Sequence, residues 1–181
     1  YSTNNEWLKE NLHDNEIYGS SHGWASNSIA GVGYSAFSSG IGEAEVAYEF
    51  TTQQIVTKYR IWPRYSSDAA RQQNIRIWEL RGANDRFSYN KDDSTTYTVL
   101  DSQSLPGTID ASGCLVGWPT ASTSYFTSAT TKASNFPNLA NEYKLSKIGS
   151  YKYYVLHITG NYGSELVAIH EWALYGGGFT I

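Results

Sequence analysis

Two β-rich runs in the last third of the chain most strongly constrain its fold. The first run, residues 151–159, alternates between an apolar face and a more polar face. The apolar face consists of Tyr154, Leu156 and Ile158, and the opposite face carries Lys152, Tyr153 and His157. This alternation is typical of a half-buried antiparallel strand. A turn rich in Gly and Asn leads into the second run, residues 166–176, so the two runs predict a β-hairpin.

The second run contains one carboxylate, Glu171, between Ile169 and Trp172. An acidic side chain inside an apolar strand costs free energy unless a charge or a hydrogen bond compensates it. We therefore expect another part of the chain, or a bound ion, to neutralise Glu171.

The composition favours an all-β protein of one domain. Of the 181 residues, 40% are hydrophobic, which suffices for one core. The 15 Tyr and 6 Trp favour strands, and the 16 Gly supply turns.

A net charge of −4 argues against a nucleic-acid partner, and no apolar run is long enough to insert into a membrane. The single Cys114 cannot form an internal disulfide. Because no Met or signal peptide starts the chain, we expect a processed piece of a longer polypeptide.

Short β-rich runs separated by turn residues predict several further strands. They cover residues 44–50, 54–62, 75–80, 97–101 and 142–145. The alternation in the first of these places Tyr48 inward and Glu45 outward, and in the second it groups Ile55 with Tyr59. Many short strands of this kind predict a β-sandwich.

Residues 104–141 interrupt this pattern with a stretch rich in Ser, Thr, Ala, Gly and Pro. A structureless loop of this length is uncommon in a compact domain. We interpret it as an insertion within a single domain that spans residues 1–181. Its large aromatic side chains are expected to be exposed, and they are Trp118, Tyr125, Phe126 and Phe136.

Residues 11–27 are dense in oxygen-bearing side chains and turn formers. Two interpretations remain open. The segment is either a surface loop closed by Asx and Ser turns or a loop that binds calcium through carboxylate, carbonyl and hydroxyl oxygens. The spacing of an EF-hand is absent.

Five phrases, taken in order, resemble one family. They are residues 56–64, 78–85, 97–102, 153–159 and 168–176. Together they resemble the discoidin, or coagulation-factor type C, family, which includes the family-32 carbohydrate-binding modules. The resemblance implies a jelly-roll β-sandwich of the galactose-binding type, here with a long insertion. It also implies a structural calcium ion, held by an early loop and by the acidic residue of the last strand. The matching positions here are Leu12, Asp14, Ser21 and Glu171.

The same resemblance implies a sugar site in loops at one end of the sandwich. An Arg, an amide and an aromatic ring are expected there, and the matching positions are Arg64, Gln72 and Tyr162. Their loop neighbours Tyr65 and Asn161 complete the predicted ligand-binding set. Planar donors suit paired hydroxyls, and a ring stacks on the apolar face of a sugar. The alternative is that Arg64 only pairs with Asp68 and that Tyr162 only decorates a turn.

The leading hypothesis is a non-catalytic, lectin-like module that binds extracellular or cell-surface glycans and is itself secreted or displayed on a cell or virion. Modules of this kind are often appended to larger glycan-active enzymes. The alternative hypothesis is an adhesion module of a fibre, virion or matrix that binds neighbouring protein chains through residues 104–141. Catalysis by this chain is not expected, because no nucleophile–base or metal–protease motif is present.

Overall fold

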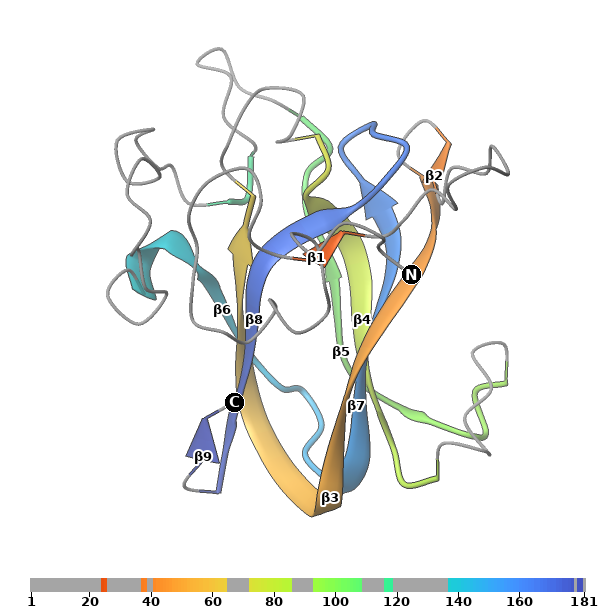
Figure 1. The fold of residues 1–181 in the computed structure, drawn as a ribbon, viewed down its shortest axis with the longest axis vertical. Coiled ribbons are helices and arrows are strands. Elements are labelled where there is room, and N and C mark those ends of the chain that lie inside the picture. The colour runs from red at the N-terminus through yellow and green to blue at the C-terminus, as the bar shows by residue number, and fades with distance from the viewer. Residues whose placement is uncertain are drawn as a thin grey trace.

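The computed structural model describes residues 24–25, 37–38, 41–64, 72–85, 93–108, 116–118, 137–177 and 179–180. This part of the chain is almost entirely β-structure (Figure 1). Its strands are β1 (Trp24–Ala25), β2 (Phe37–Ser38), β3 (Ile41–Pro63), β4 (Ile75–Ala83), β5 (Thr98–Ser104), β6 (Asn141–Lys144), β7 (Ser150–Asn161), β8 (Ala168–Gly176) and β9 (Phe179–Thr180). A short 3-10 turn, η4 (Pro137–Leu139), precedes β6. No helix in the described ranges has the length and apolarity needed to cross a membrane.

The long strand β3 belongs to both layers of the sandwich. Its first part pairs antiparallel with β7, and its second part pairs with β8 and β6. The pairing of β3 with β7 shifts register between Glu49 and Gln54, where the strand bends at the lower end of Figure 1. The sheet order β1-β8-β3-β7-β4-β5 therefore folds back on itself as two facing layers. This confirms the predicted all-β sandwich.

The predicted hairpin between residues 151–159 and 166–176 is wrong. Strand β7 pairs with β3 and β4, whereas β8 pairs with β1, β3 and β9. The connection between them bonds instead to the segment before β4: Tyr162 N donates to Gln72 O at 3.0 Å, and Ala168 N donates to Gln73 O at 2.8 Å. The chain therefore passes from one layer to the other at this turn.

The inward faces of the strands form a core that is rich in aromatic rings. The largest fully buried side chains include Tyr59, Trp78, Tyr154 and Trp172. Tyr48 packs against this cluster as predicted. The predicted face for Ile55 is wrong: its side chain is 48% exposed, whereas Val56 is fully buried. A register shift between Val56 and Lys58 interrupts the regular alternation and explains the difference.

Trp118 is buried, contrary to the prediction that it is exposed. Its side chain is 7% exposed, and its ring centroid lies 6.0 Å from that of Trp78. Its indole Nε1 also donates to the Ile75 carbonyl at 3.2 Å. Gly117, with a φ of 100°, makes the turn that directs the ring inward. Part of the predicted insertion therefore belongs to the core, while Tyr125, Phe126 and Phe136 lie outside the described residues.

Candidate functional site

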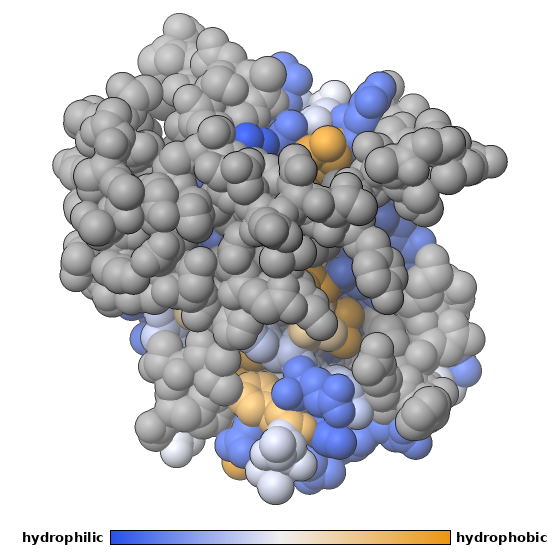
Figure 2. All heavy atoms as spheres, in the orientation of Figure 1, coloured by the Kyte–Doolittle hydropathy of each residue, from blue (hydrophilic) through white to orange (hydrophobic). Residues whose placement is uncertain are grey.

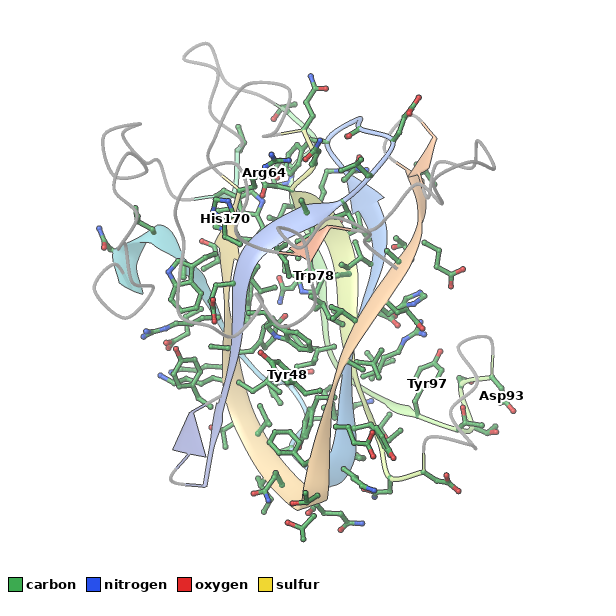
Figure 3. All side chains as sticks on the ribbon, in the orientation of Figure 1. Tyr48, Arg64, Trp78, Asp93, Tyr97 and His170 are labelled. Atoms are coloured by element: carbon green, nitrogen blue, oxygen red, sulfur yellow. The ribbon has the colours of Figure 1, made fainter. Side chains whose placement is uncertain are left out.

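Four of the predicted sugar-binding residues come together at one end of the sandwich. Arg64 directly follows β3, Gln72 precedes β4, and Asn161 and Tyr162 lie where β7 ends. The backbone bond from Tyr162 N to Gln72 O joins the two loops. This is the upper end in Figure 1, and Figure 3 labels Arg64 there. The fifth predicted residue, Tyr65, lies outside the described residues.

Arg64 is held by two side chains of the next loop. The buried Asn74 accepts a hydrogen bond from Arg64 N through Oδ1, and its Nδ2 donates to Arg64 O at 2.8 Å. The guanidinium donates to Gln73 Oε1. Burial lowers the pKa of Arg64 to about 10, so the group still carries its charge at neutral pH. Asp68, the alternative partner of Arg64, is not among the described residues.

Asn161 shapes the turn through its own amide group. Its side chain is buried, and Nδ2 donates to the carbonyls of Ser164 and Leu166, each at 2.9 Å. Its Oδ1 accepts from Gly163 N at 2.9 Å and from Ser164 N at 3.1 Å. These bonds occupy both ends of the amide. Asn161 therefore positions the loop that carries Tyr162 rather than offering its amide to the surface.

Tyr162 does not stand on the surface as a platform. Its side chain is 9% exposed and belongs to the core cluster. The hydroxyl donates to Val116 O at 2.9 Å, and burial raises its pKa to about 12. Among the predicted ligand-binding residues that the structure describes, the exposed Gln72 and the half-buried Arg64 offer the accessible side chains.

The predicted calcium ligand Glu171 lies in a buried position of β8. It is 4% exposed and stands opposite Trp62 of β3. Burial first, and then the negative charge of Glu171, raise the pKa of Tyr48, whose hydroxyl donates to Trp172 O at 2.6 Å. The other predicted ligands, Leu12, Asp14 and Ser21, lie outside the described residues.

Strand β1 runs beside β8 two residues from this acid, because Trp24 pairs with Ile169. The adjacent His170 is fully buried in β8 and is labelled in Figure 3 toward the same end of the sandwich as Arg64. The structure therefore places β1, which follows the predicted early loop in the chain, beside the strand that carries Glu171.

A second group of potential ligands was missed by sequence reasoning. Glu43, Glu45 and His157 place one ligand atom each within 4.8 Å of one another, so they could hold a metal ion. The alternating patterns put Glu45 and His157 on outer faces, but only the pairing of β3 with β7 brings them together. The pairing of two strands so far apart in the chain could not be predicted from local periodicity.

The comparisons with known proteins identify the fold. A family-32 carbohydrate-binding module from a Clostridium perfringens family-31 glycoside hydrolase has a TM-score of 0.57 at 12% identity, over 97% of this chain and 85% of the module. Another C. perfringens module of that family, in complex with GalNAc-β-1,3-galactose, has a TM-score of 0.56 at 11% identity, over 96% of this chain and 87% of that module. The chitosan-binding module 1 of a Paenibacillus chitosanase/glucanase has a TM-score of 0.54 at 11% identity, over 96% and 88% of the two chains.

The chain therefore has the discoidin-like β-sandwich fold of family-32 carbohydrate-binding modules. The sequence itself matches no protein-family model and no curated protein. At these identities the likeness describes the fold, and the ligand has to be inferred from the chain's own residues.

Proposed function

We propose that this chain is a non-catalytic carbohydrate-binding module that recognises extracellular or cell-surface glycans. The observation that supports this most directly is at the loop end of the sandwich, where Arg64 bonds to Gln73 and Asn74, and the adjacent Gln72 bonds to the β7–β8 turn. The similar modules bind sugars as different as GalNAc-β-1,3-galactose and chitosan. The fold is therefore compatible with several sugars, and the loop residues decide between them.

The proposed site binds a sugar through planar donors. The Arg64 guanidinium offers several N–H groups in fixed geometry, and the exposed Gln72 amide offers both a donor and an acceptor. Asn74 fixes the backbone of Arg64 from both sides, which reduces the ordering cost of binding. Because Tyr162 is buried, stacking on a sugar face would come from another ring, and Tyr65 is the remaining candidate of the predicted set.

Replacing Arg64 by alanine is expected to reduce glycan affinity at least about tenfold, because charge-assisted hydrogen bonds contribute about 1.5–3 kcal/mol each. The measurement is a glycan-array screen followed by calorimetric titration of the best ligand. With a pKa of about 10, Arg64 is protonated below that pH, so affinity should persist at neutral pH and fall as the pH rises through about 10.

The matched control is Arg60→Ala, which likewise removes one guanidinium, here from within β3. Arg60 pairs with Glu142 of β6 and makes none of the bonds to Gln73 and Asn74 that hold Arg64. Equal losses for the two variants, or unchanged binding by Arg64→Ala, would place the sugar site elsewhere.

We further propose that Glu171 binds a structural calcium ion together with Asp14, Ser21 and the Leu12 carbonyl. A hard cation would neutralise the buried carboxylate and connect β8 to the chain before β1. Glu171→Gln is expected to abolish the rise in melting temperature that calcium gives to the wild type. Differential scanning calorimetry with calcium and with a chelator measures this. A calcium response that survives the substitution would remove Glu171 from the site.

One observation argues against the alternative role as an adhesion module. Trp118, the first of the aromatic side chains expected on the surface of residues 104–141, is buried. Where the described residues are visible in Figure 2, apolar areas lie among hydrophilic ones. Recording the mass of the chain in solution during the glycan screen distinguishes a monomeric binder from a self-associating module.

A further inference from the structure

A polar cluster lies on the outer face of the layer that contains β7. Glu45 of β3 stands directly opposite His157 of β7, and Glu43 is two residues away on the same face of β3. Their neighbours Ala44 and Val46 pack inward against the core, which fixes the acidic side chains on the outside. The cluster is separate from the loop end that carries Arg64.

His157 is almost completely enclosed at this position, with a side chain that is 7% exposed. Its Nδ1 lies 2.7 Å from Glu45 Oε1, and its Nε2 points toward Glu43 Oε1 at 3.8 Å. The first distance is a short hydrogen bond, whereas the second is too long for one. In the neutral tautomer with its proton on Nδ1, the imidazole donates to Glu45 and keeps the lone pair on Nε2, which is the arrangement of a metal-binding histidine.

Two further described charged residues, Glu79 and Arg81, lie beside the cluster. Arg81 is the nearest described guanidinium, but its Nε and one Nη each bond to Glu79 at 2.8 Å. Its other Nη lies 3.8 Å from Glu45 Oε1, and its guanidinium stacks over the Tyr97 ring at 4.2 Å. Among these described residues, three carboxylates lie beside one guanidinium and His157. With a neutral imidazole, the formal charge of Glu43, Glu45, Glu79 and Arg81 is −2.

We propose that Glu43 and His157 bind a divalent transition-metal ion of the zinc type, with Glu45 holding the imidazole in the ligating tautomer. An imidazole nitrogen suits zinc, cobalt or nickel, whereas calcium prefers oxygen ligands alone. Ligand atoms within 4.8 Å of one another need only a small rearrangement to meet one ion at about 2.0–2.2 Å. Glu43 has a 39% exposed side chain, so it can make that adjustment.

The remaining coordination positions of the ion would be filled by water. A cavity of about 290 Å³ borders His157 and is also lined by Glu79, Arg81, Ser102 and Thr159. It leaves room for such waters beside the imidazole. This site is independent of the proposed glycan site and of the calcium site at Glu171.

The test is a calorimetric titration of the chelator-treated full chain with Zn²⁺, together with the visible absorption spectrum of the Co²⁺ form. The wild type should bind one equivalent more zinc than Glu43→Gln and His157→Gln. Glu45→Gln should weaken binding about 10–100-fold, as losses of such positioning groups do. Far-UV circular dichroism and the melting temperature of each metal-free variant report its folding.

Two controls identify the site. Glu49→Gln changes another acid of β3, whose Oε1 accepts from Tyr153 at 2.9 Å, and should leave zinc binding unchanged. Glu171→Gln should also leave it unchanged, which separates this ion from the calcium proposal. Zinc binding that is absent from the wild type, or that is equal in wild type and Glu43→Gln, would overturn the proposal and leave the cluster as an ion pair.

Discussion

Deleting residues 107–138 is expected to unfold the protein or to lower its free energy of unfolding by at least about 3–5 kcal/mol, the usual cost of truncating a buried Trp to Ala. The deletion removes Trp118, which packs at 6.0 Å from Trp78 and donates to the Ile75 carbonyl. A typical domain has a stability of about 5–15 kcal/mol, so this is a large fraction of the total. Urea unfolding followed by tryptophan fluorescence measures the loss.

The deletion also removes two carbonyl acceptors at the loop end. Val116 O accepts from the Tyr162 hydroxyl at 2.9 Å, and Gly117 O accepts from Asn141 Nδ2 at 2.6 Å. Loss of the first would leave a buried hydroxyl of the β7–β8 turn without its acceptor. We therefore expect the turn beside the proposed sugar site to be disturbed together with the core.

Point variants of Trp118 distinguish the stability lost with its ring from the stability lost with the other residues of the deleted segment. Trp118→Ala should reproduce most of the loss caused by the deletion, while Trp118→Phe should cost less because it keeps an aromatic ring against Trp78. A stable, cooperatively folding deletion variant would contradict the placement of Trp118 in the core. It would instead support the prediction from composition that the whole segment is an external insertion.

The case of Trp118 shows where sequence patterns stop being informative. Alternation predicted the inward positions of Tyr48 in β3 and of Tyr154 in β7. In a strand that packs one face on the core, every second side chain points inward and is usually apolar. Trp118 has no such neighbours. It enters the core as a single ring after a glycine turn, and the residues that follow it in the chain are Pro, Thr, Ala and Ser.

The failure of the predicted hairpin has a related cause. A turn rich in Gly and Asn between two β-rich runs is compatible with a hairpin and equally with a passage between the layers. The backbone bonds from Tyr162 and Ala168 to the chain before β4 decide between them, and these partners are far away in the sequence. The same limit explains why the cluster of Glu43, Glu45 and His157 was missed, whereas the set of Arg64, Gln72 and Tyr162 was predicted from the resemblance to a known family and not from local periodicity.

Replacing Tyr59 by phenylalanine is expected to lower the free energy of unfolding by about 2–4 kcal/mol, although only one oxygen is removed. The Tyr59 hydroxyl donates to Asp101 Oδ2 at 2.7 Å and accepts from Trp78 Nε1 at 3.0 Å. All three side chains are buried. Since Tyr59 lies in β3 and the other two in β5 and β4, the hydroxyl links the two layers through the core.

In this variant the Trp78 N–H would lose this acceptor. The buried Asp101 carboxylate would lose the hydroxyl donor and keep the hydrogen bond that Gln103 Nε2 donates to Oδ2 at 2.9 Å. Both consequences carry the desolvation cost of a buried polar group. Burial, and then the charge of Asp101, raise the pKa of Tyr59. The hydroxyl therefore keeps its proton, and the bond to Asp101 persists into alkaline solution as long as the protein is folded.

Tyr143→Phe is the matched control for this loss. The Tyr143 ring stacks on Tyr59 with centroids 5.1 Å apart, and its hydroxyl accepts from Asn141 Nδ2 at 2.9 Å. That amide also donates to Gly117 O, so losing the Tyr143 hydroxyl should cost only about 0.5–1.5 kcal/mol. Combining Tyr59→Phe with Asp101→Asn should cost less than the sum of the two single changes, because the asparagine places no uncompensated charge in the core. Additive effects, or equal losses for Tyr59→Phe and Tyr143→Phe, would show that the hydroxyl of Tyr59 does not hold the layers together.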